Sequence, residues 1–319
     1  MKKSKIFLIT IDTEADNQWD KTSDCTTYNA KYLPRFQELS EKYTFKPTWL
    51  TTYEMANNNQ FVKYFKRKQD DGFCEIGMHL HAWNTPPDYE LHTITKEKSY
   101  LIEYPIEIIE KKIQTMDDIL TNKFGIKPIS HRAGRWAIND DYINLLAKYG
   151  YKIDCSVTPH ISWKKNLGET GIGGSNYTNF PEYIYPICNG VVEMPMTIRK
   201  IRFFDKIKVK NFKSLVIELI YLILKKKQWV RPDCSYSLKG IKKVMDICSS
   251  KNDYIMFMIH SSELMPNGSP RFKTKNDIEM LYNNIEEIFK YANKLGYKGM
   301  TLKEFYMTYC DGDVNGEDK

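Results

Sequence analysis

Short apolar runs alternate with amphipathic segments along most of the chain. A run such as 5–12 (KIFLITID) has the length and the β-branched content of a buried strand. The segment 105–125 instead repeats its apolar residues at intervals of three and four, as an amphipathic helix does, and it ends at Gly125. The expected strands are 5–12, 46–53, 74–83, 128–134, 151–157 and 253–263, the expected helices are 32–43, 59–72, 105–125, 140–150 and 275–296, and further units lie at 236–251 and 297–306.

Strands that alternate with helices indicate a parallel α/β fold. Six or seven such units in 319 residues fit a barrel better than an open sheet. The region 160–235 breaks the alternation, because it is first rich in Gly, Asn, Tyr and Pro and then basic and apolar. We therefore predict one barrel domain over residues 1–319, with an insertion at about 160–235 that shapes one side of a cleft.

The composition is that of a folded globular protein. Hydrophobic residues make up 42% of the chain and charged residues 27%, which excludes extensive disorder. The net charge of +7 is modest and spread along the chain, so no nucleic acid partner is expected. The basic stretch 199–231 admits a helix resting on a membrane surface. A core helix flanked by solvated lysines is the favoured interpretation of this stretch.

The cysteines and the apolar runs favour the cytoplasm. Seven cysteines show no CxxC spacing, which argues against a disulfide framework and against a thiolate zinc site. The first apolar run ends at Asp12 and is too short for the core of a signal peptide. The longest run, 215–224, contains a glutamate and is half the length of a membrane-spanning helix.

Two pairs of metal-ligating residue types follow two of the expected strands. Asp12 and Glu14 are two residues apart at the end of the first, and His79 and His81 are two apart at the end of the third. Alternate residues of a strand share a face, and the carboxyl ends of parallel strands meet at one edge. These four side chains would form an oxygen and nitrogen site for zinc or another divalent transition metal. Each pair alone also admits a structural interpretation, a helix cap for the carboxylates and a surface pair for the histidines.

Three more expected strands end in ionisable groups. The stretch SHRAGRW offers Arg132 and Arg135, IDCSVTP offers Asp154, and FMIHSSEL offers His260. Taken singly, Arg132 could pair with a surface acid, Asp154 could cap a turn, and His260 could be a satisfied buried histidine. Together they predict a catalytic cleft at this edge.

These stretches resemble the five motifs of the NodB-homology polysaccharide deacetylases, carbohydrate esterase family four. TIDTE, EIGMHLHAW, HRAGRW, DCSVTP and IHSSEL occur in the family's order, and HLH-Trp with Pro-Pro resembles its WalW-like branch. The resemblance implies a distorted (β/α)7 barrel that removes acetyl groups from amino sugars with a divalent metal, zinc first and cobalt or nickel as alternatives. It further implies a glycan substrate, in the biosynthesis of a surface glycan.

The resemblance also implies a role for each matching position. His81 departs from the pattern, because the family's second histidine corresponds to Trp83, so His81 would take its place. Backbone N–H groups near Gly134 and Arg135 would stabilise the oxyanion, and Trp83 and Trp136 would contact the sugar. The implied roles are general base for Asp12, metal ligands for Glu14, His79 and His81, orientation of the base for Arg132, general acid for His260, and support of that acid for Asp154.

Two other functions stay open on the sequence. One is a metal-dependent amidohydrolase or phosphoesterase that acts on a substrate other than a glycan, since a His-x-His pair after a barrel strand is also used there. In those enzymes the pair usually follows the first strand, which here carries Asp12 and Glu14. The other is a catalytically inactive glycan-binding protein of the same fold, which would bind no stoichiometric metal.

Overall fold

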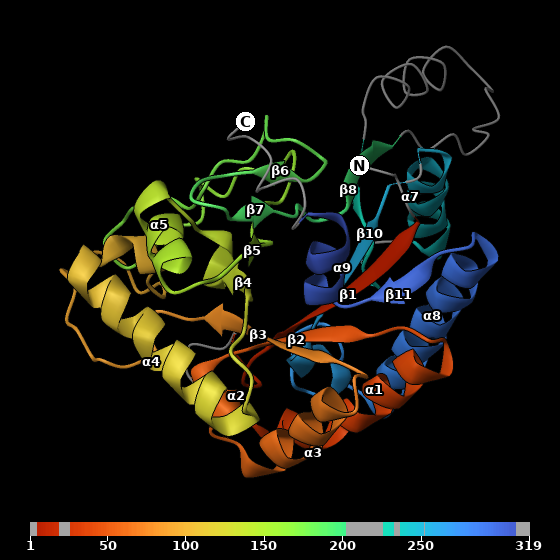
Figure 1. The fold of residues 1–319 in the computed structure, drawn as a ribbon, viewed down its shortest axis with the longest axis horizontal. Helices are drawn as coiled ribbons and strands as arrows, with labels where there is room; N and C mark the ends of the chain where they lie inside the picture. The colour runs from red at the N-terminus through yellow and green to blue at the C-terminus, as the bar shows by residue number, and fades with distance from the viewer. Residues whose placement is uncertain (1–4, 19–25, 202–225, 233–236, 252, 311–319) are drawn as a thin grey trace, which may run out of the picture.

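A curled sheet surrounded by helices forms the body of the molecule in the computed structural model, which describes residues 5–18, 26–201, 226–232, 237–251 and 253–310 (Figure 1). The sheet contains nine strands within these ranges, and a separate hairpin contains two. The strands of the sheet are β1 (Ile6–Thr13), β2 (Pro47–Thr51), β3 (Glu75–Leu80), β4 (Ser130–Ala133), β5 (Ile153–Asp154), β6 (Tyr185–Pro186), β7 (Val192–Glu193), β10 (Ile255–His260) and β11 (Lys298–Met300).

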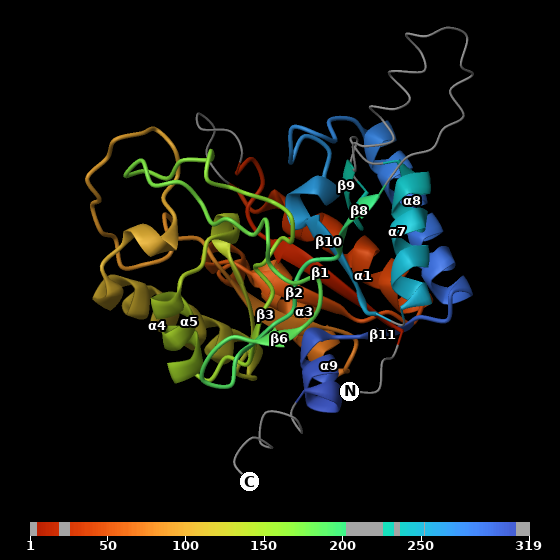
Figure 2. The ribbon, with the colours of Figure 1, turned by 90° about the horizontal axis from the view of Figure 1, so that it is seen from above.

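The strand order is β10-β1-β2-β3-β4-β5-β7-β6, and β11 pairs with β1. The seven strands from β10 to β7 are parallel along this path, and only β6 is antiparallel to its neighbour. The curl and the flanking helices make the sheet a distorted half-barrel (Figure 2). The predicted fold class, a distorted (β/α)7 barrel, is confirmed.

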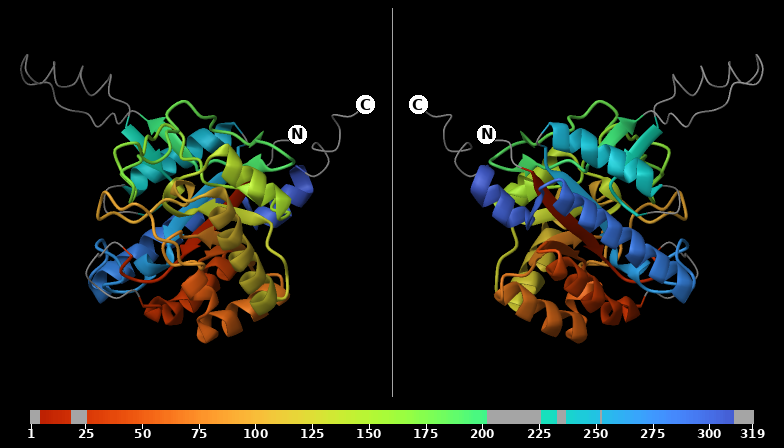
Figure 3. Two further views of the ribbon diagram at one scale, coloured as in Figure 1. Left: turned by 90° about the vertical axis from the view of Figure 1, so that its left-hand side faces the viewer. Right: turned by 90° about the vertical axis from the view of Figure 1, so that its right-hand side faces the viewer.

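Helices cover the outer face of the sheet (Figure 3). Their ends follow from the sequence: the Asn58 side chain accepts a hydrogen bond from the Phe61 N–H at the start of α3, and Gly125 takes a left-handed conformation after α4. The helices are α1 (Leu33–Lys42), α2 (Tyr53–Ala56), α3 (Asn59–Asp70), α4 (Ile106–Phe124), α5 (Asp140–Lys148), α7 (Leu238–Ser250), α8 (Lys275–Lys294) and α9 (Leu302–Tyr309), with 3-10 turns η1 (Tyr28–Tyr32), η2 (Leu101–Glu103), η3 (Gly134–Trp136) and η4 (Ser261–Leu264).

Two apolar clusters hold the sheet, one on each side. Between the sheet and the outer helices, aromatic rings pack edge to face, as Phe36 does on Trp49 and Phe45 on Phe289. The second cluster is rich in methionine and in aliphatic side chains, among them Leu8, Leu50, Met194, Met196, Met256 and Met258. Every residue of β1 from Ile6 to Thr13 is buried, so this central strand is held firmly by its surroundings. The residues at its carboxyl end, such as Glu14, are therefore well positioned.

The hairpin of β8 (Ile198–Ile201) and β9 (Lys226–Trp229) bridges the gap between β7 and β10. The Met256 N–H donates to Thr197 Oγ1 at 2.8 Å, and the Met258 N–H donates to the Val230 carbonyl at 3.4 Å. The wall of the barrel is thus completed by side chains and single hydrogen bonds at this seam rather than by a strand ladder.

Two long loops stand together above the carboxyl ends of the strands. The segment after β3 meets the segment 160–177 where the N–H groups of Ile94 and Thr95 donate to the Glu169 carbonyl (Figure 2). Part of the predicted insertion, 202–225, lies outside the described residues, and so does most of the basic stretch 199–231. Among the helices that the structure describes, none has the length and apolar content needed to span a bilayer.

Candidate active site

Sequence-distant polar residues meet at the carboxyl ends of β1, β3, β4 and β10. The strand register places Asp12 beside His260 on β10, and it places His79 beside Arg132 on β4. Side chains of register partners in a parallel sheet point to the same face. Glu14 follows β1 directly, and its N–H donates to the Ser261 hydroxyl at 2.9 Å, which ties it to the end of β10.

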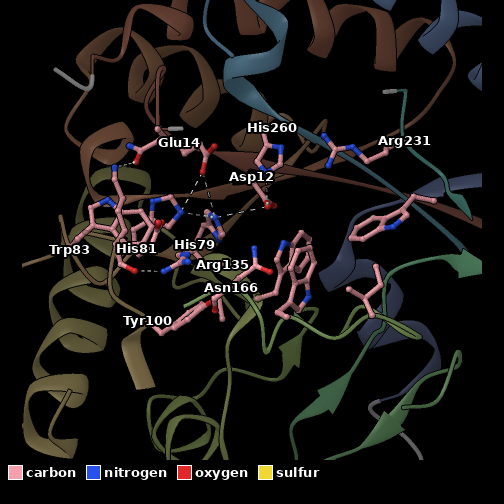
Figure 4. Close-up of a pocket in the computed structure, with 18 of the residues that line it drawn as sticks. Asp12, Glu14, His79, His81, Trp83, Tyr100, Arg135, Asn166, Arg231 and His260 are labelled. Carbon is pink, nitrogen blue, oxygen red and sulfur yellow. Dashed lines mark hydrogen bonds and ion pairs between the residues drawn. The ribbon is translucent and has the colours of Figure 1, made fainter. Parts of the chain in front are cut away.

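Three of these side chains form a compact group of metal-ligating atoms. One ligand atom from each of Glu14, His79 and His81 lies within 4.8 Å of the other two. The two Nε2 atoms are 3.0 Å apart, and Glu14 Oε2 lies 3.4 Å from His81 Nε2. β3 ends at Leu80, so His81 stands just past the strand rather than on it, but both imidazoles still face the carboxylate (Figure 4).

The protonation of this group suits a cation. Burial lowers the pKa of His79 to about 4, and it lowers the pKa of His81 well below the ordinary value, so both rings are neutral at neutral pH. His79 Nδ1 lies 2.9 Å from the Arg132 carbonyl, which can only accept, so Nδ1 carries the proton and Nε2 keeps its lone pair. Burial and neighbouring carboxylates, Asp12 first, raise the pKa of Glu14 well above its usual range. A divalent cation would offset that penalty, since it favours the ionised carboxylate.

Asp12 is held as a carboxylate by a buried arginine. Arg132 Nη1 donates to Asp12 Oδ1 at 2.5 Å, and Nη2 and Nε donate to Thr10 Oγ1 and the Cys155 carbonyl at 3.0 Å each. Burial alone would raise the pKa of Asp12, but Arg132 first, and then His79 and His260, together outweigh it, so the pKa lies below its ordinary value of 3.8. The other oxygen, Oδ2, is 3.9 Å from His79 Nε2, so it faces the ligand group.

His260 stands on the opposite side of Asp12 from the two histidines. Its Nε2 is 3.7 Å from Asp12 Oδ2, and its Nδ1 is 3.2 Å from Glu263 Oε2. Arg231 Nη2 donates to both oxygens of Glu263, at 2.7 and 2.8 Å, and Arg271 Nη1 to one of them at 3.2 Å. Burial would raise the pKa of Glu263, but Arg231 first and His260 next hold it well below the usual range. An ionised carboxylate therefore faces the inner nitrogen of His260.

Asp154 does not lie where the resemblance implied, because the pleat of the sheet turns it away. Its register partner on β4 is His131, the neighbour of Arg132, so Asp154 faces the side opposite to the site. There its Oδ1 is 2.7 Å from His131 Nδ1, and the hydroxyl of Ser156 donates to it at 2.8 Å. The expected support of His260 by Asp154 is therefore wrong, and Glu263 occupies that place.

The group opens into a cavity of about 530 Å³. Arg135, Trp83 and Trp136, which the sequence had singled out, line it together with Trp163. Arg231, Tyr100 and Asn166 also line it (Figure 4), as do Arg271, Lys98 and Trp229, and these six were not foreseen. Trp83 stacks on His81 with ring centroids 4.3 Å apart, and Trp136 lies over the Arg132 guanidinium at 5.1 Å. Glu263 was also missed, although the sequence carried a signal for it. A glutamate three residues after His260 is the spacing of a capping box, and the two residues form one at η4.

The turn after β4 is packed against the metal-ligating group. A Cβ on Gly134 would lie 2.6 Å from the Leu80 carbonyl oxygen and 2.7 Å from His81 Cδ2, so only glycine fits. Arg135 and Trp136 then take φ values of 55° and 64°, in the left-handed region that side chains of this size rarely adopt. The predicted contact of the Gly134 and Arg135 N–H groups with an oxyanion stays a prediction.

Gly134→Ala is expected to weaken metal binding about 10-fold or more, because the added methyl group displaces the His81 ring from its partners. Zinc titration by calorimetry measures this. Gly72→Ala is the matched control: it places alanine at φ 76° far from the site, where nothing lies within 4 Å of the new Cβ. It should cost about 1 kcal/mol of stability and leave zinc affinity unchanged. Equal zinc affinities for the two variants would contradict the expectation.

No family model matches the chain, and no curated protein matches it. Solved structures do match over nearly its whole length. The Xyl-CE4 domain of a multidomain xylanase from the hindgut metagenome of Trinervitermes trinervoides is 10% identical with a TM-score of 0.45, over 96% of this chain and 91% of that one. A putative polysaccharide deacetylase from Mycobacterium smegmatis is 13% identical with a TM-score of 0.46, over 95% of each chain. A mutant of BA3943, a CE4 family pseudoenzyme with restored enzymatic activity, is 12% identical with a TM-score of 0.46, over 95% and 68%.

Proposed function

We propose that the chain is a metal-dependent deacetylase that hydrolyses the N-acetyl group of an amino sugar. One observation carries the proposal: the Glu14–His79–His81 group, an ionised Asp12 and His260 open together into one aromatic-lined cavity. A ligand set, a base and a proton donor around a single cavity are what amide hydrolysis requires. Glu14, His79 and His81 would hold the cation, and zinc, cobalt or nickel suits one carboxylate with two imidazoles.

Asp12 is the general base in this proposal. When bound, the cation would polarise the acetyl carbonyl and lower the pKa of a water molecule towards neutrality. Asp12 Oδ2 faces the ligand group, so it is placed to take one proton from the attacking water while the hydroxyl adds to the carbonyl carbon. Arg132 holds the other oxygen and keeps the carboxylate both ionised and oriented.

His260 is the general acid. His260 lines the cavity with its Nε2 3.7 Å from Asp12 Oδ2, and from there it would donate a proton to the sugar nitrogen as the carbon–nitrogen bond breaks. An amine leaves poorly unless it is protonated, so this step needs a donor. The products are acetate and the free amino sugar, and the atoms of one water molecule are divided between them.

Glu263→Gln is expected to lower kcat about 100-fold, because the carboxylate that faces His260 Nδ1 loses its charge and no longer stabilises the imidazolium. Asp154→Asn is the matched control, since Asp154 contacts His131 on the other side of the sheet. This control variant should change the free energy of unfolding and leave kcat nearly unchanged. In a His260→Gln background, Glu263→Gln should add little further loss, and a fully additive loss would contradict a role through His260.

Acetate release tests the function itself. The zinc-loaded protein is incubated with N-acetylglucosamine, its oligomers and a nitrophenyl phosphate ester, and acetate and phosphate are measured side by side. Acetate release that is lost on chelation and restored by zinc or cobalt supports the proposal. Phosphate release alone would favour the phosphoesterase alternative. If the protein binds no stoichiometric metal and releases neither acetate nor phosphate, the inactive glycan-binding alternative would be favoured.

The wider setting is also part of the proposal. Four cysteines within the described residues, 74, 155, 188 and 248, are free thiols, which fits the reducing cytoplasm that the sequence favoured. A cytoplasmic deacetylase of amino sugars would act on a precursor of a surface glycan. Assignment to the WalW-like branch stays a prediction.

A further inference from the structure

One wall of the cavity carries two cationic side chains whose hydrogen bonds go to neutral groups. Lys98 is still within electrostatic reach of the Glu14 and Glu54 carboxylates, and its charge favours their ionised forms. The Lys98 ammonium donates to Gln18 Oε1 at 3.0 Å, and the Arg135 guanidinium donates to the carbonyls of Lys98 and Leu167. Both residues line the cavity beside Glu14 and His81. Across the parts of the chain that the structure describes, neither forms an ion pair with a carboxylate, and neither does so with Glu97, the acid on the same wall.

Aromatic rings fix these cations in place. The Lys98 Nζ is 5.0 Å from the centroid of the Trp83 ring, and the Arg135 Cζ is 4.1 Å from the centroid of the Tyr100 ring. Such contacts orient a cation without neutralising it. The two cations also cover part of the Trp83 and Tyr100 rings, and Trp83 stacks on His81 as well. This wall therefore offers a ligand positive charge rather than an open aromatic face.

The opposite wall differs. Arg231 and Arg271 line the cavity there, but both bind the carboxylate of Glu263, so their charge is partly balanced by protein. By contrast, no carboxylate in the parts of the chain that the structure describes forms an ion pair with Lys98 or Arg135, so both side chains direct positive charge at the cavity. A partly buried cation of this kind favours a ligand that brings a negative charge.

We propose that the Lys98–Arg135 pair is a subsite for an anionic group of the substrate, a carboxylate or a phosphate. The proposal rests on the proposed function, because it names the class of amino sugar: an acidic one, with its charged substituent against this wall while its acetyl group faces Asp12. A neutral N-acetylated sugar would leave both cations facing solvent and would gain nothing from them.

Equilibrium binding tests the subsite without turnover. Calorimetry at low salt compares N-acetylglucosamine with N-acetylmuramic acid, which adds a carboxylate, and with N-acetylglucosamine 1-phosphate, which adds a phosphate. Each is titrated into zinc-loaded and into metal-stripped, dialysed protein. The acidic sugars should bind about 5- to 10-fold more tightly than the neutral one in both forms, and added salt should reduce the difference. The tighter of the two identifies the anion.

Lys98→Gln should remove most of this preference, and Arg135→Gln should reduce it as well. Lys96→Gln, an exposed lysine of the same loop that does not line the cavity, is the matched control and should keep it. Equal affinities for charged and neutral sugars, no binding of either acidic sugar, or a preference untouched by Lys98→Gln would each overturn the proposal. So would a preference confined to the zinc-loaded form, since the anion would then sit on the metal. Preferential binding without acetate release would leave the subsite standing while the deacetylase function fails.

Discussion

Replacing His79 and His81 together by alanine is expected to reduce bound zinc from one equivalent to a trace and to lower the hydrolysis rate about 1,000-fold or more. The double variant leaves Glu14 as the sole member of the ligand group, and one carboxylate does not hold a transition metal tightly. Without the cation, the acetyl carbonyl is no longer polarised and the pKa of the attacking water is no longer lowered. These two effects together stabilise the transition state by several kcal/mol. Metal analysis of the purified protein and acetate release measure the two effects.

The control is His92→Ala, which removes an exposed histidine outside the cavity. It should leave both zinc content and rate unchanged. Because the two alanines also empty space in a buried region, thermal unfolding of the metal-free proteins should be compared, and the single variant His81→Gln should reproduce most of the loss of zinc with less loss of packing. Full zinc occupancy in the double variant would mean that the ion binds elsewhere, and the deacetylase proposal would then fail with it.

Asp12→Asn is expected to lower kcat about 100-fold or more while the protein still binds zinc. Asparagine keeps the shape and the hydrogen bond to Arg132, but it cannot take a proton from water. Zinc content by metal analysis and kcat by acetate release separate the base from the ligand set. If zinc were lost together with activity, Asp12 would be a metal ligand rather than the base. Asp141→Asn, an exposed carboxylate at the start of α5, controls for loss of charge and should retain full activity.

The same variant should change the dependence of stability on pH. In the wild type, the pKa of Asp12 is lower in the folded state than its ordinary value of 3.8, so the unfolded chain binds the proton more readily. The contribution of the pair to the free energy of unfolding is therefore fully present above the ordinary value and is lost as the pH falls through the lower folded value. Asp12→Asn should cost about 2 kcal/mol at neutral pH and should flatten this acid-side slope. An unchanged slope would show that Arg132 does not stabilise the carboxylate.

The sequence was sufficient for the fold and for the meeting of Glu14, His79 and His81, because strand-length apolar runs and two-residue spacings are local patterns. Strand-length apolar runs predicted β1, β3 and β10 to within a few residues, and the two-residue spacing of His79 and His81 survived although β3 ends between them. The run 46–53 was less exact, since β2 ends at Thr51 and α2 begins at Tyr53. The apolar run therefore spans the end of one element and the start of the next.

The sequence could not show that Asp154 is not the partner of His260, because the face that Asp154 takes depends on the register between strands. Whether Asp154 faces the site is decided by its pairing with His131 rather than with Arg132, a shift of one residue that reverses the face. Nothing within either strand fixes that choice. Lys98 was missed for a related reason: it belongs to a loop, and its place over Trp83 depends on how that loop packs against the segment 160–177.

That loop pair restricts how the specificity of this protein could be re-engineered. Ile94 and Thr95 donate to the Glu169 carbonyl, and the Thr170 N–H donates to Glu103 Oε1, so each loop satisfies polar groups of the other. Grafting a foreign sequence into one loop would leave polar groups of the other loop, a backbone carbonyl or a carboxylate, without their hydrogen-bond partners. Libraries that aim to alter which sugars enter should therefore diversify both loops together, as a single cassette.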